Sequence, residues 1–236
     1  ASENVSLAAA AEPYGYALAL SVAEELGAQH LAAVRTRVKD SPVDVDVHGL
    51  LDDPAVLPRA ARGESRYADI VLIPGAERWR DDALRRHISE TVLFTGTPIL
   101  IMPADWTPRA FTHLALGWNA SLESFRATRT LLTLAEPGAS TDVLVVDQIE
   151  NYQAGQAVPG SYIARHLARH GLRVEVHAIP SCKRGAAYTM QSFVAQHGAD
   201  ALVVGGYGRS RALEFILGGV TRELIGYQQV PVVLVH

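Results

Sequence analysis

Short runs of β-branched and other apolar residues alternate with longer amphipathic segments along the second half of the chain. Five of these runs have the length of buried strands and end at glycine, proline or polar residues: 113–117, 141–147, 172–178, 201–205 and 230–235. Segments with apolar residues at helical spacing lie between them, at 122–134, 162–170, 186–197 and 220–227. The alternation predicts right-handed βαβ units, and therefore an α/β fold built on a parallel sheet.

The first half of the chain repeats part of this plan. The sequence ADIVLIPG at 68–75 parallels ADALVVGG at 199–206, and each is followed by a proline-led apolar run, at 98–102 and 231–235. Internal similarity on this scale indicates duplication, with a proline-rich linker near 103–109. We therefore expect two α/β domains in tandem, at 1–106 and 107–236.

One part of the first half does not fit this plan. Candidate strands occur near 5–9, 31–36 and 43–50, but only a handful of residues separate the last two. A parallel crossover needs about a dozen residues or more. Either the first domain has lost a crossover helix or residues are missing at this point, and missing residues are the preferred interpretation.

Composition narrows the possible partners and location. The net charge is −4 and only two of the 236 residues are lysine, so a dense basic face for nucleic acid is not expected. No apolar run approaches the ~20 residues of a membrane span. The single cysteine, Cys182, rules out an internal disulfide, and no basic, signal-like start is visible. These features predict a cytoplasmic protein that binds neither nucleic acid nor membrane.

A glycine-rich segment after the run at 201–205 is the sharpest chemical feature. Its first glycines are Gly205, Gly206 and Gly208, and a second pair, Gly218 and Gly219, stands where a helix should begin. Free N–H groups and the macrodipole at a helix start favour an anion, and Arg209 lies close by in the sequence to pair with phosphate. The same glycines could serve only to turn the backbone from strand to helix, so both interpretations stay open.

The spacing Gly-x2-Gly-x9-Gly from Gly205 to Gly218, between ADALVV and VPVVLV, resembles the signature of universal stress proteins. The run 206–222 is similar to the two-domain bacterial branch in particular, and GWNAS at 117–121 resembles the family's first strand and turn. The resemblance implies two doubly wound, Rossmann-like domains in tandem, each with a five-stranded parallel sheet. It also implies that the strands at 98–102 and 230–235 pair with each other or across a homodimer.

In nucleotide-binding members, the resemblance implies a loop that cradles the phosphates of ATP. Carried onto this chain, the contacts would come from residues in the first two strands, the loop and the following helix: Asn119, Val145, Val204, Gly205, Gly208, Arg209, Gly218, Gly219 and Val220. Gly219 stands where binders usually carry Ser or Thr, and Asn119 where they usually carry an acid. In the first half, Pro74 removes an N–H donor and Glu77 brings a carboxylate, so that site is expected to be degenerate.

These features favour a non-catalytic stress-response protein that binds ATP, AMP or a similar phosphate-bearing ligand in its second domain. One alternative is a protein-interaction module whose glycine loop is purely structural. A slow ATPase is a third, less favoured possibility, because no general base or metal-ligand set is visible in the sequence. His166 and His170 are spaced like two metal ligands on a helix, but no third ligand is evident, and no metal site is expected.

Overall fold

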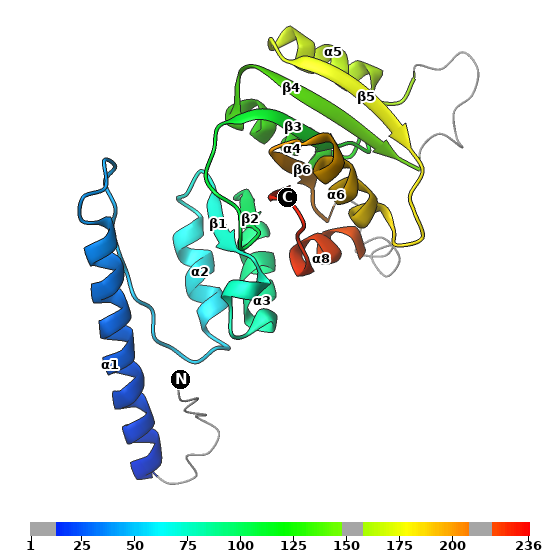
Figure 1. Ribbon diagram of the computed structural model, residues 1–236. Helices are drawn as coiled ribbons and strands as arrows, with labels where there is room; N and C mark the ends of the chain where they lie inside the picture. The colour runs from blue at the N-terminus through cyan, green and yellow to red at the C-terminus, as the bar shows by residue number, and fades with distance from the viewer. Residues whose placement is uncertain (1–12, 148–157, 208–218) are drawn as a thin grey trace. The chain divides into compact units, whose positions relative to one another are not determined.

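The computed structural model describes residues 13–147, 158–207 and 219–236 (Figure 1). The chain divides into two compact units, Ala1–Leu57 and Pro58–His236. None of the helices in the described residues combines the length and the apolar character needed to cross a bilayer. Gly208, Arg209 and Gly218 of the predicted site, and the candidate strand near 5–9, lie outside the described residues.

The first unit is built around one long helix, α1 (Pro13–Val38). The strand expected at 31–36 is therefore wrong, because α1 continues through it, and the expected strand at 43–50 has no regular structure. Alanine and arginine are good helix formers, and Gly27 inside the helix weakens it without ending it. The segment after α1 lies against the helix instead, with an Nη2 of Arg35 donating to the carbonyl oxygen of Val47 at 3.2 Å.

The second unit contains a single seven-stranded sheet with the order β1-β2-β7-β6-β3-β4-β5. The strands are β1 (Val71–Pro74), β2 (Ile99–Met102), β3 (Phe111–Gly117), β4 (Ala135–Val146), β5 (Arg173–Ile179), β6 (Ala201–Gly205) and β7 (Val232–Val235). All neighbouring pairs are parallel except β2 and β7. The five strands expected in the second half are confirmed. The five expected in the first half are not, because its described residues supply only β1 and β2.

Helices cover both faces of this sheet, which is the α/β class that the alternating pattern predicts. They are α2 (Leu57–Ser65), α3 (Asp82–Leu93), α4 (Leu122–Leu134), α5 (Ser161–Arg169), α6 (Ala186–His197) and α8 (Gly219–Gly226), with a short 3₁₀ turn at Ala76–Arg78. Buried residues of α3, α6 and α8 form one core with the sheet, and those of α4 and α5 form the other. Figure 1 shows α6 between β5 and β6 along the chain.

The antiparallel pairing of β2 and β7 joins the two halves of the chain. Ile99 lies opposite Leu234, and Ile101 lies opposite Val232. All four side chains are fully buried in the core that α3, α6 and α8 share. The strands at 98–102 and 230–235 thus pair with each other within one chain, so neither is left as an open edge.

A buried arginine links α3 to α8. The Arg85 side chain is 0% exposed, and its Nη2 donates to the carbonyl oxygen of Ile225 at 2.7 Å, near the carboxyl end of α8. A cation at that end of a helix interacts favourably with the macrodipole. Burial raises the pKa of Asp82, but hydrogen bonds from Arg85 and Arg86 outweigh it and hold that pKa below its ordinary value.

Replacing Arg85 with alanine tests this link. The Arg85→Ala variant removes one of the two buried donors to the Ile225 carbonyl, the other being Nε2 of Gln228, and it empties a fully buried position, so we expect the free energy of unfolding to fall by about 1–3 kcal/mol. Arg86→Ala is the matched control, because Arg86 also contacts Asp82 but is partly exposed, and its loss should cost less than about 1 kcal/mol. Urea unfolding measures both, and equal losses would contradict the assigned role of Arg85.

Candidate functional site

The carboxyl ends of β3 and β6 mark the point where the sheet order reverses. From β3 the chain proceeds to β4 and β5 on one side, whereas β6 and β7 lie on the other. Ligands of open α/β sheets bind in the crevice outside such a switch point. Because Gly117 lies opposite Val204, the segments that follow β3 and β6 leave the sheet side by side. The structure therefore brings the predicted Asn119 and Gly205 to the same edge.

Gly205 lies against the first turn of α4. A Cβ added at this position would stand 2.5 Å from the carbonyl carbon of Glu123 and 2.6 Å from the backbone nitrogen of Ser124. Both are backbone atoms, which cannot rotate away as a side chain would. The close packing of α4 on β6 thus requires glycine at position 205, independently of any ligand.

The start of the glycine loop is held by α8 and β7. The N–H of Gly206 donates to the carbonyl oxygen of Val235 at 2.7 Å, and the N–H of Tyr207 donates to the hydroxyl oxygen of Thr221 at 3.2 Å. Tyr207 has φ of +57°, a left-handed conformation that non-glycine residues adopt infrequently. The buried hydroxyl of Thr221 thus fixes the turn that leads into the loop.

Asn119 caps the turn between β3 and α4. Its side-chain oxygen accepts the N–H of Ser121 at 3.0 Å, across Ala120 with φ of +60°. The hydroxyl of Ser121 in turn accepts the N–H of Ser124 and caps α4. Asn119 is exposed, and its amide NH₂ donates to no residue in the described part of the chain. That group is the part of Asn119 available to a ligand.

The predicted valines contribute to the core more than to the surface. Val145 is fully buried beside Gly160, and Val204 is nearly so. Val220 packs partly buried against the core of α3, α6 and α8. A ligand at the strand ends would therefore meet the backbone of Val145 and Val204 and not their side chains.

Gly219 is the open position of the site. It is the first described residue of α8 and it is exposed, and apart from its chain neighbours and the backbone of its own helix, no atom of the described residues lies within 4 Å of the place where a Cβ would stand. The N–H groups of the first turn of a helix lack intrahelical partners and lie at the positive end of the macrodipole. This combination of free donors and space suits an anionic group.

A pocket of about 400 Å³ lies beside the loop, at the carboxyl end of β7. Three segments line it. They supply Arg126, Arg129 and Thr130 of α4, then Phe94, Thr95, Gly96 and Pro98 before β2, and finally Val235 and His236. Phe94 stacks on Tyr207 with ring centroids 5.0 Å apart. Neither arginine forms an ion pair with the described residues. Sequence reasoning missed both, although their i, i+3 spacing on a predicted helix was a visible sign.

The corresponding turn of the first half, after β1, carries Pro74, Gly75 and Glu77. Pro74 ends β1, and its carbonyl oxygen accepts the indole N–H of Trp79 at 3.1 Å. A Cβ at Gly75 would stand 2.8 Å from a carboxylate oxygen of Glu77. The Glu77 carboxylate thus lies in the first-half turn that corresponds to the glycine loop of the second half. That this turn does not bind phosphate stays a prediction.

Residues 110–236 match the model of the universal stress protein family. The chain belongs to this family. A comparison of this universal stress protein with curated proteins finds no significant match.

Among solved structures, a universal stress protein from Archaeoglobus fulgidus DSM 4304 superposes with a TM-score of 0.66 at 15% identity, covering 95% of this chain and 79% of that one. A functionally unknown protein from Pseudomonas aeruginosa PAO1 gives 0.50 at 12% identity, with 88% and 77% covered. A universal stress protein in complex with cAMP gives 0.38 at 19% identity, with 54% and 99% covered. At these identities the first two likenesses concern the fold alone, and they cover most of this chain.

Two glycines of this universal stress protein allow a matched test of packing. We expect Gly205→Ala to lower the free energy of unfolding by about 1–3 kcal/mol, because its methyl group overlaps the backbone of α4. Gly219→Ala meets open space at a helix start and should leave stability unchanged or raise it by up to about 1 kcal/mol. Thermal and urea unfolding measure both, and a tolerated Gly205→Ala would show that α4 does not need this close approach.

Proposed function

We propose that this protein is a non-catalytic stress-response protein that binds an adenine nucleotide, ATP or AMP, or a similar phosphate-bearing ligand through its second half. Membership of the universal stress protein family supports the general role. The observation that carries the ligand proposal is the exposed, unobstructed Gly219 at the start of α8, which follows the switch-point loop. The tandem domains at 1–106 and 107–236, a homodimer and a cytoplasmic location stay predictions.

Charge on the same edge of the sheet supports an anionic ligand. Arg126 and Arg129 line the pocket next to Tyr207, and guanidinium groups bind phosphate bidentately. Gly208, Arg209, Gly218 and Val220 complete the proposed phosphate-binding segment. Asn119 would offer its NH₂ group, and the backbone at Val145 and Val204 would meet the ribose or the base.

A purely structural glycine loop is the second candidate, and particular contacts favour it. Gly205 is explained by its packing against α4, and the hydroxyl of Thr221 already accepts the N–H of Tyr207. Under this alternative the protein acts through protein partners, and its loop binds no nucleotide.

A negative charge placed at Gly219 distinguishes the nucleotide-binding proposal from the purely structural loop. Gly219→Glu has room for its side chain, and a carboxylate at a helix start favours folding, so the variant should fold normally. It should weaken nucleotide binding by about tenfold or more, equivalent to about 1.4 kcal/mol, whereas Gly219→Ala should change it little. Thermal-shift titrations with ATP, AMP and cAMP measure the effect.

Mass spectrometry of the denatured, freshly purified protein identifies any nucleotide that it carried. Absence of released nucleotide, together with no thermal shift for any of the three ligands, would overturn the binding proposal and leave the structural loop. Equal affinity in wild type and Gly219→Glu would show that a nucleotide binds elsewhere.

A further inference from the structure

Four polar side chains lie on one face of the sheet, away from the glycine loop. They are His113 of β3, Asp142 of β4, and Glu175 and His177 of β5. Side chains alternate between faces along a strand, and Ala115 and Leu144, two residues further along β3 and β4, belong to the core of α3, α6 and α8. The four therefore share the face that α6 covers.

The pairing of the strands brings these side chains into contact. The carboxylate of Asp142 bridges two imidazoles, with Oδ2 2.7 Å from Nε2 of His113 and Oδ1 3.0 Å from Nε2 of His177. The same Nε2 of His177 is 4.0 Å from Oε2 of Glu175. One ligand atom from each of Asp142, Glu175 and His177 lies within 4.8 Å of the other two. Ligand atoms about 2.1 Å from a tetrahedral ion stand about 3.4 Å apart, so small side-chain movements suffice to surround one.

The surroundings hold these donors in place. The side chain of Asp142 is 11% exposed and that of His177 is 19% exposed, whereas Glu175 is 76% exposed and leaves one side open to solvent. The His177 ring packs on Phe193 of α6 with centroids 4.7 Å apart. Two packed donors on neighbouring strands, with a third donor on the open side, are an arrangement expected of a binding site.

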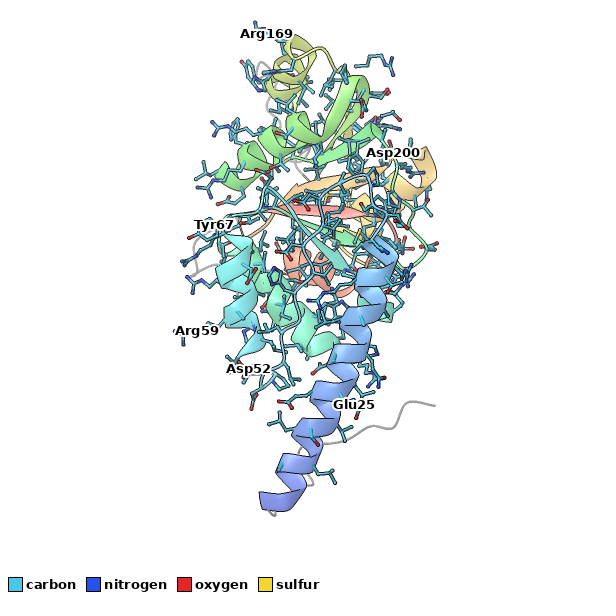
Figure 2. All side chains as sticks on the ribbon, turned by 90° about the vertical axis from the view of Figure 1, so that its left-hand side faces the viewer. Glu25, Asp52, Arg59, Tyr67, Arg169 and Asp200 are labelled. Carbon is cyan, nitrogen blue, oxygen red and sulfur yellow. The ribbon has the colours of Figure 1, made fainter. Side chains whose placement is uncertain are left out.

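A further hydrogen-bond network fixes the start of β3. Asp200, labelled in Figure 2, accepts the backbone N–H groups of Thr112 and His113, each at 2.8 Å. Arg109 holds its other oxygen at 3.0 Å. His113 is thus positioned by its backbone as well as by Asp142. The contact between His113 and Asp142 can in turn orient the Asp142 carboxylate, as hydrogen bonds commonly do for carboxylates that bind a metal.

We propose that Asp142, Glu175 and His177 bind a divalent first-row transition ion, with Zn²⁺ as the probe, and that His113 orients Asp142 from behind. One imidazole nitrogen and two carboxylate oxygens make a three-ligand set that leaves a position for water. With the ion bound, Nε2 of His177 is unprotonated and the ring carries its proton on Nδ1. The site is separate from the proposed nucleotide site, so either could exist without the other.

The test is Zn²⁺ titration of the full chain after dialysis against a chelator, followed by calorimetry or by competition with a chromophoric chelator. We expect one ion per chain. His177→Gln should weaken binding at least tenfold, and Glu175→Gln should weaken it too without disturbing the fold, because this side chain is largely exposed. Circular dichroism confirms that each variant is folded.

Two controls separate this site from adventitious binding. The ring centroids of His166 on α5 and His170 directly after it lie 4.7 Å apart, and the His166→Gln, His170→Gln double variant should bind Zn²⁺ as wild type does. Glu136→Gln, an exposed position of β4, should also bind normally. No stoichiometric binding by wild type, undiminished binding by His177→Gln, or loss of binding only in the α5 double variant would each overturn the proposal.

Discussion

The antiparallel pairing of β2 with β7 is the interaction on which the rest of the second unit depends. Each strand has only four residues, and each is fully or nearly fully buried on both faces, so neither would be stable as an open edge. Their pairing lets the first half contribute two strands to a sheet whose other five come from the second half. The shared core of α3, α6 and α8 follows from it.

This pairing also shapes the edge where the candidate site lies. Because β2 runs against β7, the turn before β2 comes to the carboxyl end of β7, beside the glycine loop. Phe94 thereby stacks on Tyr207, while the hydroxyl of Tyr207 hydrogen-bonds Glu90 of α3 at 3.0 Å. Residues of the first half thus lie beside the proposed site, whose glycines belong to the second half. If the glycine loop binds phosphate as proposed, the first half supports it through these contacts.

Sequence reasoning succeeded where local pattern and tertiary structure agree. In the second half, each strand is a short apolar run between breakers, and the helices α4 and α6 begin and end where their periodicity predicts. In the first half the same reasoning expected a strand at 31–36, after a helix that was expected to end near Gly27, but helix-forming alanine and arginine residues continue α1 past that glycine to Val38. The hydrophobic pattern of single segments also could not predict one mixed sheet, because the pairing of 99–102 with 232–235 depends on contacts between residues distant in sequence.

The candidate sites differ in how visible they are to sequence. The glycine loop is contiguous, so its motif could be read directly from the sequence. Only the structure shows that Gly205 packs against the backbone of α4, whereas a Cβ at Gly219 would meet no atom of the described residues beyond its own helix and chain neighbours. His113, Asp142 and His177 are about thirty residues apart on three strands, and no spacing rule connects them. Their proximity follows from register: β4 pairs with both β3 and β5, and residues of matching parity face one side. Once the order of strands is known, polar residues of matching parity on neighbouring strands become as informative as a motif, and here they support the proposed metal site, which no sequence motif indicates.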